Sequence, residues 1–295
     1  MLAGLLNACG DGSSDNALDT QANLQQQGRV LYASATAAPE GDGSRTAPFD
    51  SLQALEAASA PGDTLIILPS PVEVPALDGG IQLKSGQRLL GDGPSVLLQT
   101  PNAAVSGAAE LMQQPRIRNT DMARLNGDVV RLAPNSQVSN LVVTESVRGG
   151  IYGLNVPGVK VTGNDVSGFN TSCTIGFTVE PFPAPSSFPQ GAAPLVLPAG
   201  WAGIMVDADN GEGEIDISSN YVHDSACGNG IDVRISGSAD YLAQVSQNFV
   251  TQLEHGPLHE LDEIHLVHAI TLQVTDDARL EAESNSNTQT FIGSP

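Results

Sequence analysis

The stretch Val161-Thr-Gly-Asn164-Asp-Val is one of five similar phrases along this 295-residue chain, each an apolar alternation interrupted by an asparagine. The other phrases centre on Asn140, Asn220, Asn248 and, more weakly, Asn285. Repeats with periods of about 20 to 50 residues indicate stacked units that bury their apolar faces only against their neighbours. The phrase therefore predicts a solenoid.

The composition favours an all-β solenoid that forms one domain. Only 4% of the residues are aromatic, and Gly, Ser, Asn, Val and Ile are plentiful, which suits narrow stacked strands and tight turns. The formal net charge is −21, from 33 acidic and 12 basic residues. Such a charge repels phosphate backbones, so we expect no nucleic-acid partner. A polyanionic sugar would need a bridging cation.

The segment Ala47-Pro-Phe-Asp50-Ser-Leu-Gln53-Ala-Leu-Glu-Ala-Ala predicts a short helix, with Asp50 and Gln53 as a capping box. Pro61-Gly-Asp and the buried-type strand Thr64-Leu-Ile-Ile-Leu follow it. Together they resemble the N-terminal cap of the pectate-lyase-like superfamily. The resemblance implies a right-handed parallel β-helix whose open end is plugged by a short capping helix.

The spacing of the repeats supports this resemblance independently. From each aligned strand start, the phrase asparagine follows after 10, 13, 16, 17 and 15 residues. The return from asparagine to the next start takes 11 residues twice, but 40 and 22 residues in the other two cases. One half of each coil is thus nearly constant, and two coils carry insertions in the other half. The aligned starts are Val130, Ile151, Ile204, Ile231 and Ile270.

In the superfamily's terms, these starts would open the first of three strands in each coil. The asparagine would lie in the tight turn between the second and third strands, where it tolerates a left-handed backbone and can bond the same group one coil away. The insertions, at about 171–201 and 253–267, would then fall in the third turn.

The N-terminus resembles the end of a bacterial lipoprotein signal, with Leu6 and Ala8 before an acylated Cys9. In this interpretation, residues 1–8 are a signal remnant, 9–28 a flexible tether and 29–295 the solenoid. We then expect an exported lipoprotein of the cell envelope, in the outer membrane or periplasm, anchored to the membrane through Cys9. The alternative is a disordered N-terminus with an incidental cysteine. Because the chain stops without an amphipathic cap, we expect further coils or a covering subunit after residue 295.

The resemblance places a sugar-binding groove along the outer face of the first strands. Side chains alternate across a strand, so two outward rows can be assigned from the aligned starts. The rows place Asp207 beside Arg234 and close to Asp232, and these three residues are the candidate catalytic group. The alternative is an exposed ion pair on a solvated face. Arg131, Tyr152 and Gln273 of the same rows are candidate substrate-binding residues.

Two clusters could bind metal. Asp207, Asp209 and Glu212 lie in an acidic segment that could hold Ca²⁺, although the segment reads equally as an exposed turn. Four of the five histidines fall within 255–268, where they could bind Zn²⁺ or supply a base, or simply balance the charge of an acidic loop.

Two cysteines should meet across neighbouring coils. Cys173 lies nine residues after Asn164, and Cys227 lies seven after Asn220. Both therefore fall at similar points of stacked third turns. A disulfide is expected, in agreement with export, and the alternative is two buried thiols.

The sequence is compatible with two functions. The first is a protein that binds or processes polysaccharide, as a lyase or glycoside hydrolase if it is an enzyme. Against it stands the scarcity of lysine, which occurs only at Lys84 and Lys160, and the lack of a paired-aspartate signature. The second is a noncatalytic envelope scaffold or adhesion protein.

Overall fold

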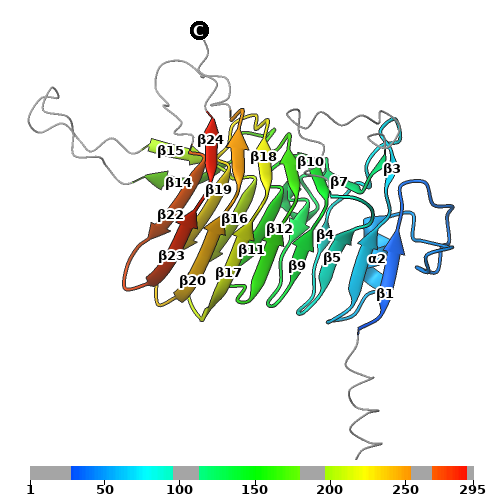
Figure 1. The fold of residues 1–295 in the computed structure, drawn as a ribbon, viewed down its shortest axis with the longest axis horizontal. Coiled ribbons are helices and arrows are strands. Elements are labelled where there is room, and N and C mark those ends of the chain that lie inside the picture. The colour runs from blue at the N-terminus through cyan, green and yellow to red at the C-terminus, as the bar shows by residue number, and fades with distance from the viewer. Residues whose placement is uncertain (1–27, 96–112, 180–196, 254–267, 291–295) are drawn as a thin grey trace, which may run out of the picture.

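The apolar alternation of the sequence forms three parallel sheets that run along the molecule (Figure 1). The computed structural model describes residues 28–95, 113–179, 197–253 and 268–290. From Val130 onward, each of five successive coils gives one strand to each sheet. The chain is therefore a parallel β-helix, as the repeated phrase predicts.

Sheet 1 contains the strands that open each coil. Its register pairs Val130 with Ile151, Ile151 with Ile204, Ile204 with Ile231 and Ile231 with Ile270, which confirms the alignment made from the sequence. In spatial order its strands are β4 (Ile81–Gln82), β8 (Val130–Arg131), β11 (Ile151–Leu154), β16 (Ile204–Ala208), β19 (Ile231–Ile235) and β22 (Ile270–Val274).

Sheets 2 and 3 hold the second and third strands of each coil. Sheet 2 consists of β1 (Val30–Ala33), β2 (Thr64–Ile67), β5 (Arg88–Gly91), β9 (Gln137–Ser139), β12 (Val159–Thr162), β17 (Glu212–Ser218), β20 (Asp240–Ser246) and β23 (Arg279–Asn285). Sheet 3 consists of β7 (Arg116–Asn119), β10 (Val142–Ser146), β13 (Asp165–Ser167), β18 (Tyr221–His223), β21 (Phe249–Thr251) and β24 (Thr288–Thr290). Every pairing within these two sheets is parallel.

The inward side chains of the three sheets form a single core. In β16, for example, Ile204, Val206 and Ala208 are at most 2% exposed, and they stack on the equivalent residues of β19. Each buried Val or Ile contributes roughly 2 kcal/mol through the removal of apolar surface from water. The stacking of aliphatic side chains in matching rows helps to hold the coils in register.

A helix closes the N-terminal end, as expected, but its cap differs from the expected one. Helix α2 (Leu52–Ala58) buries Leu52 and Leu55 and packs against β1 and β4. Its N-cap is Ser51, whose hydroxyl accepts a hydrogen bond from the backbone N–H of Ala54. The capping box of Asp50 and Gln53 was therefore a wrong prediction, because the helix starts one residue later than that pattern requires.

Smaller elements lie outside the three sheets. Two short antiparallel pairs join β3 (Ser70–Pro71) to β6 (Gln113–Gln114), and β14 (Ile175–Val179) to β15 (Leu197–Gly200). The second pair belongs to the long insertion, which falls in the third turn as expected. A short 3₁₀ helix, η3, covers Leu125–Gly127. None of the helices in the described ranges has the length and apolar character needed to cross a membrane.

The asparagines stack in the turn between sheets 2 and 3, but two of the five predicted members were wrong by one or two residues. The stack consists of the buried residues Asn164, Asn220 and Asn248 and the partly buried Asn287. Leu141 occupies the equivalent position in the Asn140 phrase, and Asn287 replaces Asn285. The left-handed backbone belongs to the residue before each stacked asparagine, such as Ser219 with φ 56°.

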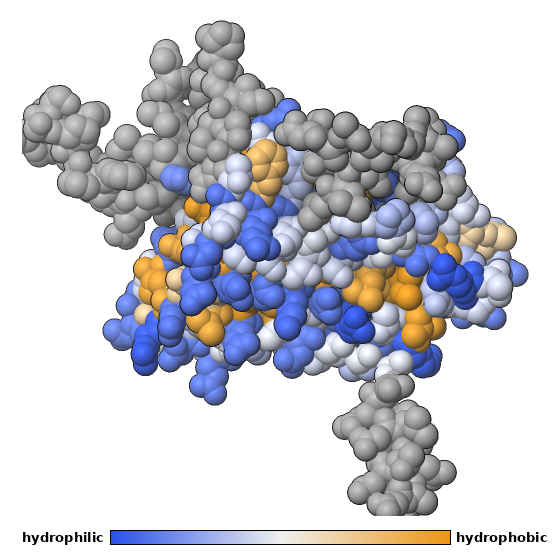
Figure 2. All heavy atoms as spheres, viewed as in Figure 1, coloured by the Kyte–Doolittle hydropathy of each residue, from blue (hydrophilic) through white to orange (hydrophobic). Residues whose placement is uncertain are grey.

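The last described coil is less buried than the others. Its strands β22, β23 and β24 each pair on one side only among the described strands. Figure 2 shows a mostly hydrophilic surface over β17, β20 and β23, with hydrophobic patches near the end of the solenoid where β22 and β23 lie. Ile270, Leu272 and Leu280 are accordingly only partly buried.

Candidate functional site

The outer face of sheet 1 carries the two rows of side chains expected from the sequence. On neighbouring coils, the parallel register sets Met205 against Asp232, and we call this the first row. It sets Asp207 against Arg234, and we call this the second row. The same register adds Tyr152 to the first row and Leu154 to the second. The two rows differ sharply in exposure, and this difference decides what each can do.

The first row is covered. Met205 and Asp232 have no exposed surface, and Tyr152 is only 9% exposed. Trp201, which directly follows β15, forms an apolar cluster with Tyr152, Ala202 and Met205. The rings of Tyr152 and Trp201 meet edge to face with centroids 5.1 Å apart. Trp201, at the C-terminal end of the insertion, therefore packs on the first row of the sheet.

Tyr152, one of the expected substrate-binding residues, belongs to this covered cluster, and Arg131, a second one, borders the cluster with 22% of its side chain exposed. The guanidinium of Arg131 lies 5.0 Å from the Tyr152 ring centroid, and that of Arg148 lies 3.8 Å from the Trp201 ring. Arg131 Nε and Arg148 Nη2 each donate to Asp128 Oδ2 at 2.6 Å, and Asp128 is fully buried. Burial raises the pKa of Tyr152 to about 12, so its phenol stays protonated.

Asp128, Arg148 and Trp201 are residues that the sequence analysis missed. Asp128 lies two positions before the strand start Val130, at the place that Asn229 takes before Ile231. Extending the alignment of strand starts by two residues toward the N-terminus would have found it. The stacking of Arg148 on Trp201 joins two different turns, and no spacing in the sequence signals it.

Asp232, which pairs in register with Met205 of this row, is a fully buried carboxyl. The side-chain amide of Asn229 donates to both of its oxygens, at 3.3 and 3.1 Å. Burial disfavours the carboxylate and raises the pKa of Asp232 to about 7, although the amide of Asn229 and the charge of Arg234 act in the opposite direction. Asp232 thus has the proton affinity of a general acid but no contact with solvent in this structure.

Asp207 and Arg234 form a two-point ion pair that borders the covered row. Arg234 Nε donates to Asp207 Oδ1 at 2.8 Å, and Nη2 donates to Oδ2 at 2.7 Å. Nη1 donates to the carbonyl of Gly176 in β14 at 3.0 Å, so the same guanidinium fastens the insertion to sheet 1. The two side chains are 19% and 17% exposed, and the pair is therefore visible to a ligand at its edge.

An open groove lies over the second row. It encloses about 430 Å³ and crosses β11, β16, β19 and β22. Leu154 is 51% exposed at one end, and Gln273 lies toward the other. The lining residues are Leu154, Asp207, Ala208, Asp209, Arg234, Ile235, Ser236, Gln273 and Thr275. Of the expected site residues, this groove gathers Asp207, Arg234 and Gln273, whereas Asp232, Tyr152 and Arg131 do not line it.

The expected calcium ligands do not converge. Asp207 is held by Arg234, and Asp209 Oδ1 accepts from the side-chain amides of Asn155 and Asn210. Glu212 lies on sheet 2, where it pairs in register with Asp240. Within the described ranges, no three or more His, Cys, Asp or Glu side chains are grouped so that they could hold a metal ion. Calcium binding remains a prediction without a preformed site in these ranges.

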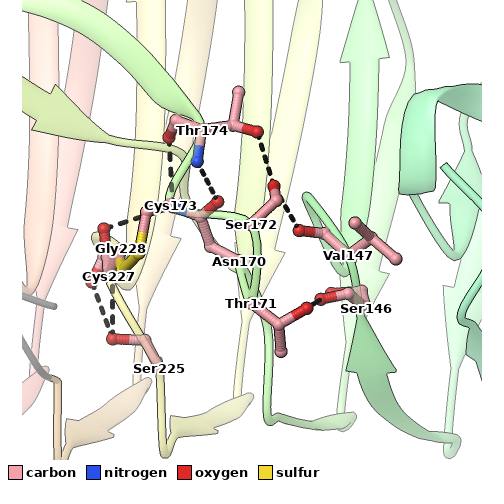
Figure 3. The surroundings of a disulfide bond; sticks show 10 residues. All are labelled: Ser146, Val147, Asn170, Thr171, Ser172, Cys173, Thr174, Ser225, Cys227 and Gly228. Atoms are coloured by element: carbon pink, nitrogen blue, oxygen red, sulfur yellow. Dashed lines mark hydrogen bonds between the residues drawn. A yellow bond between two sulfur atoms is a disulfide. The ribbon is translucent and has the colours of Figure 1, made fainter. Parts of the chain in front are cut away.

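A disulfide joins Cys173 to Cys227, the two cysteines expected to meet (Figure 3). Their Cα atoms are 5.0 Å apart, across the third turns of neighbouring coils. Asn170 Nδ2 donates to the carbonyls of Thr174 and Cys227, both at 3.1 Å, which fixes the same junction without the sulfur atoms. The base of the long insertion is therefore attached to the coil that follows it.

Other sequence predictions fall outside the described residues. They include the lipid attachment at Cys9 with the tether up to residue 27, most of the shorter insertion, and His255, His259 and His265 of the histidine cluster. His268 is described, and its backbone N–H donates to Asn229 Oδ1 at 2.8 Å. The backbone of His268 is thus linked to the buried carboxyl of Asp232 through the side chain of Asn229.

Comparisons with known proteins give a fold likeness alone. The sequence matches no protein-family model, and no curated protein matches it. Two solved structures of a GH136 lacto-N-biosidase from Eubacterium ramulus are similar over 93% of this chain and 70% of theirs. The selenomethionine derivative gives a TM-score of 0.38 at 11% identity, and the native protein gives 0.28 at 12%. Scores this low assign no activity, so function rests on the chemistry of the groove.

Proposed function

We propose that this chain is an exported β-helix protein that binds polysaccharide in the groove over the second row of sheet 1. The observation that carries the proposal is the groove itself, which is open across four coils and lined mainly by polar side chains. Coils stack about 4.8 Å apart, a spacing comparable to the length of one sugar ring. A glycan lying along the solenoid axis would therefore meet a different coil, with its own side chains, at each ring.

The lining suits sugar hydroxyls. Carboxylate and amide groups such as those of Asp207, Asp209 and Gln273 accept and donate hydrogen bonds in fixed planes. The exposed side chain of Leu154 offers an apolar contact for the C–H face of a ring. A few oriented polar groups beside apolar surface are the usual composition of a small-molecule site.

Binding without cleavage fits the geometry better than hydrolysis or elimination. Glycoside hydrolysis normally needs two carboxyl groups on either side of the scissile bond. Asp207 is held in a two-point ion pair by Arg234, and Asp232 is fully buried. The first carboxyl can accept hydrogen bonds from a glycan but is engaged by a cation, and the second does not line the groove, so the two do not face a common bond.

A hydrolase or lyase is the second candidate, and one observation favours it. Asp232 has a pKa of about 7, which is suited to a general acid near neutral pH. Strongly shifted carboxyls are also common at catalytic sites. This interpretation requires that Asp232, which is fully buried in this structure, become accessible when the substrate binds.

The proposal also includes the compartment of the protein and its superfamily. The disulfide supports an oxidising compartment, since such bonds are rare in the cytosol. A lipid anchor at Cys9 would then hold the solenoid at a bacterial envelope surface. We assign the chain to the pectate-lyase-like superfamily on its capping-helix motif, and a scaffold role without any glycan is the alternative that the experiment must separate.

The test is binding of the purified protein to immobilised plant and algal polysaccharides, with release of reducing ends and of unsaturated sugars measured in parallel. Gln273→Ala should weaken binding about fivefold, the effect of losing one hydrogen bond. Gln244→Ala, on the exposed face of β20, is the matched control and should leave the affinity for polysaccharide unchanged. Retention of no polysaccharide would overturn the proposal in favour of a scaffold. Release of sugars that Asp232→Asn abolishes would favour the enzyme.

A further inference from the structure

The proposed function raises the question of which class of polysaccharide the groove accepts. Arg234 is the single basic side chain among the described residues that line it, whereas Asp207 and Asp209 are both acidic. The chain as a whole carries a formal charge of −21. The charge inside the groove is therefore decided by what Arg234 does with its guanidinium.

The guanidinium of Arg234 is already engaged on several sides. Two of its nitrogens face the carboxylate of Asp207 at 2.8 and 2.7 Å, in the geometry that a uronate would need for itself. The third nitrogen donates to the Gly176 carbonyl, and Nη2 also lies 3.7 Å from Met205 Sδ. A uronate could bind Arg234 only by displacing Asp207 and leaving that carboxylate without its partner.

The remaining acid of the groove adds to the barrier. Asp209 accepts hydrogen bonds from the side-chain amides of Asn155 and Asn210, which hold its carboxylate in place at the rim. The cation of the described lining, Arg234, pairs with the carboxylate of Asp207. A chain of uronates would therefore approach fixed negative charge at short range, which is unfavourable even after screening by salt.

We infer that the groove selects uncharged polysaccharide and rejects polyuronates, and that the Asp207–Arg234 pair sets this specificity. The inference rests on the proposed function, since it concerns the ligand of the same groove. Neutral hydroxyl groups can donate to the outer lone pairs of Asp207 and Asp209 and bond to Gln273 without breaking the pair. The pair thus disfavours acidic sugars, because Asp207 occupies the guanidinium nitrogens of Arg234 that a uronate carboxylate would need.

The experiment compares oligosaccharides that differ in charge alone. Hexamers of galacturonate, mannuronate and guluronate are each tested beside the same hexamer after reduction of its carboxyl groups to primary alcohols. Titration calorimetry at low and at physiological salt gives the affinities. The native chain should bind at least one reduced hexamer about tenfold or more tightly than its acidic parent.

Asp207→Asn is the deciding variant, because it keeps the shape of the side chain and removes the carboxylate charge that makes the two-point pair with Arg234. It should narrow the preference to within about threefold or reverse it, mainly through tighter binding of the acidic hexamer. Asp209→Asn is the matched control, since it removes the same charge without freeing an arginine. It should shift the preference by a clearly smaller factor.

The outcomes separate the inference from the proposed function. If the native chain binds an acidic hexamer as tightly as its reduced form, the selection is refuted while glycan binding stands. If Asp209→Asn shifts the preference as far as Asp207→Asn does, general charge and not the ion pair sets it. If no hexamer and no polysaccharide binds, the proposed function itself fails. Circular dichroism and the melting temperature establish that each variant is folded.

Discussion

The side-chain amide of Asn164 donates to Oδ1 of Asn220 at 3.0 Å, although the two residues are 56 positions apart in the sequence. The backbone N–H of Asn164 donates to the same oxygen at 3.1 Å. Asn220 makes the same two bonds to Asn248, and Asn248 makes them to Asn287. The asparagines therefore form a continuous ladder along the solenoid, which is buried except at its last member, Asn287.

Asn220→Ala should be strongly destabilising. The change removes the oxygen that Asn164 bonds twice and the amide that donates to the Val161 carbonyl at 2.8 Å. Leaving such buried groups unpaired should cost roughly 3 to 5 kcal/mol. Urea unfolding followed by circular dichroism measures the loss.

Asn285→Ala is the matched control for the ladder. It replaces an asparagine of the sequence phrase that the structure places two positions away from the ladder residue Asn287. Its loss should change the stability by less than about 0.5 kcal/mol. Equal effects of the two substitutions would mean that the ladder does not stabilise the fold.

The comparison of Asn140 with Asn164 shows how far the sequence could specify the fold. Both follow an apolar alternation, and the sequence pattern therefore predicts that they occupy equivalent positions. The register instead pairs Ser139 with Thr162, so Asn140 takes the left-handed position and Leu141 the buried one. The period and the strand starts were predictable because many apolar residues fix them together. The exact place of one polar residue in a turn depends on which neighbour is buried.

The strand register of the candidate site was predictable, but the side chains that bury part of the site were not. Aligning Ile204 with Ile231 was sufficient to set Asp207 beside Arg234. The packing of Trp201 on Tyr152 depends on how an insertion of irregular sequence folds back on the sheet. No periodicity describes that contact, and so Asp232 was expected on an open face when it is in fact buried.

Asp232 should make the protein less stable as the pH rises. Its pKa is about 7 in the folded chain and near 3.8 when exposed, so between these values the folded state holds a proton that the unfolded state has lost. Stability then falls with pH by at most about 1.4 kcal/mol per unit. Urea unfolding of the native chain and of Asp232→Asn from pH 4 to pH 8 should show the variant gaining in relative stability across this range.

A control keeps that experiment specific to the buried carboxyl. Asp277 is exposed on the last coil, and Asp277→Asn should follow the native pH profile throughout. Parallel profiles for Asp232→Asn and the native chain would show that Asp232 is not protonated at neutral pH in the folded state.

His223 should have the opposite effect on the pH profile. Its Nδ1 lies 2.6 Å from Asp224 Oδ2 and its Nε2 lies 2.9 Å from Asp165 Oδ1, and only an imidazolium can donate to both. Burial opposes the charge, but the hydrogen bonds and charges of Asp165 and Asp224 outweigh it and raise the pKa of His223. The stabilisation is full below pH 6.5 and is lost as the pH rises through the raised value.

His223→Gln should therefore destabilise the chain at pH 5.5 and approach the native stability at high pH, as measured by urea unfolding across that range. His268→Gln is the informative control, because burial lowers the pKa of His268. That histidine costs stability as the pH falls below 6.5, and its removal should help most at low pH. The same trend for both variants would contradict the assignment of His223 as an imidazolium.

The disulfide should contribute substantially to stability because its cysteines are 54 positions apart. Closing a loop of this length restricts the unfolded chain and corresponds to about 4 kcal/mol in the loop-entropy model. Guanidinium unfolding of the native chain with and without reductant should show this difference. The double variant Cys173→Ser with Cys227→Ser should match the reduced chain and should not respond to reductant. A native chain whose unfolding midpoint is the same in both conditions would mean that the hydrogen bonds of Asn170 to Thr174 and Cys227 are sufficient to hold the insertion.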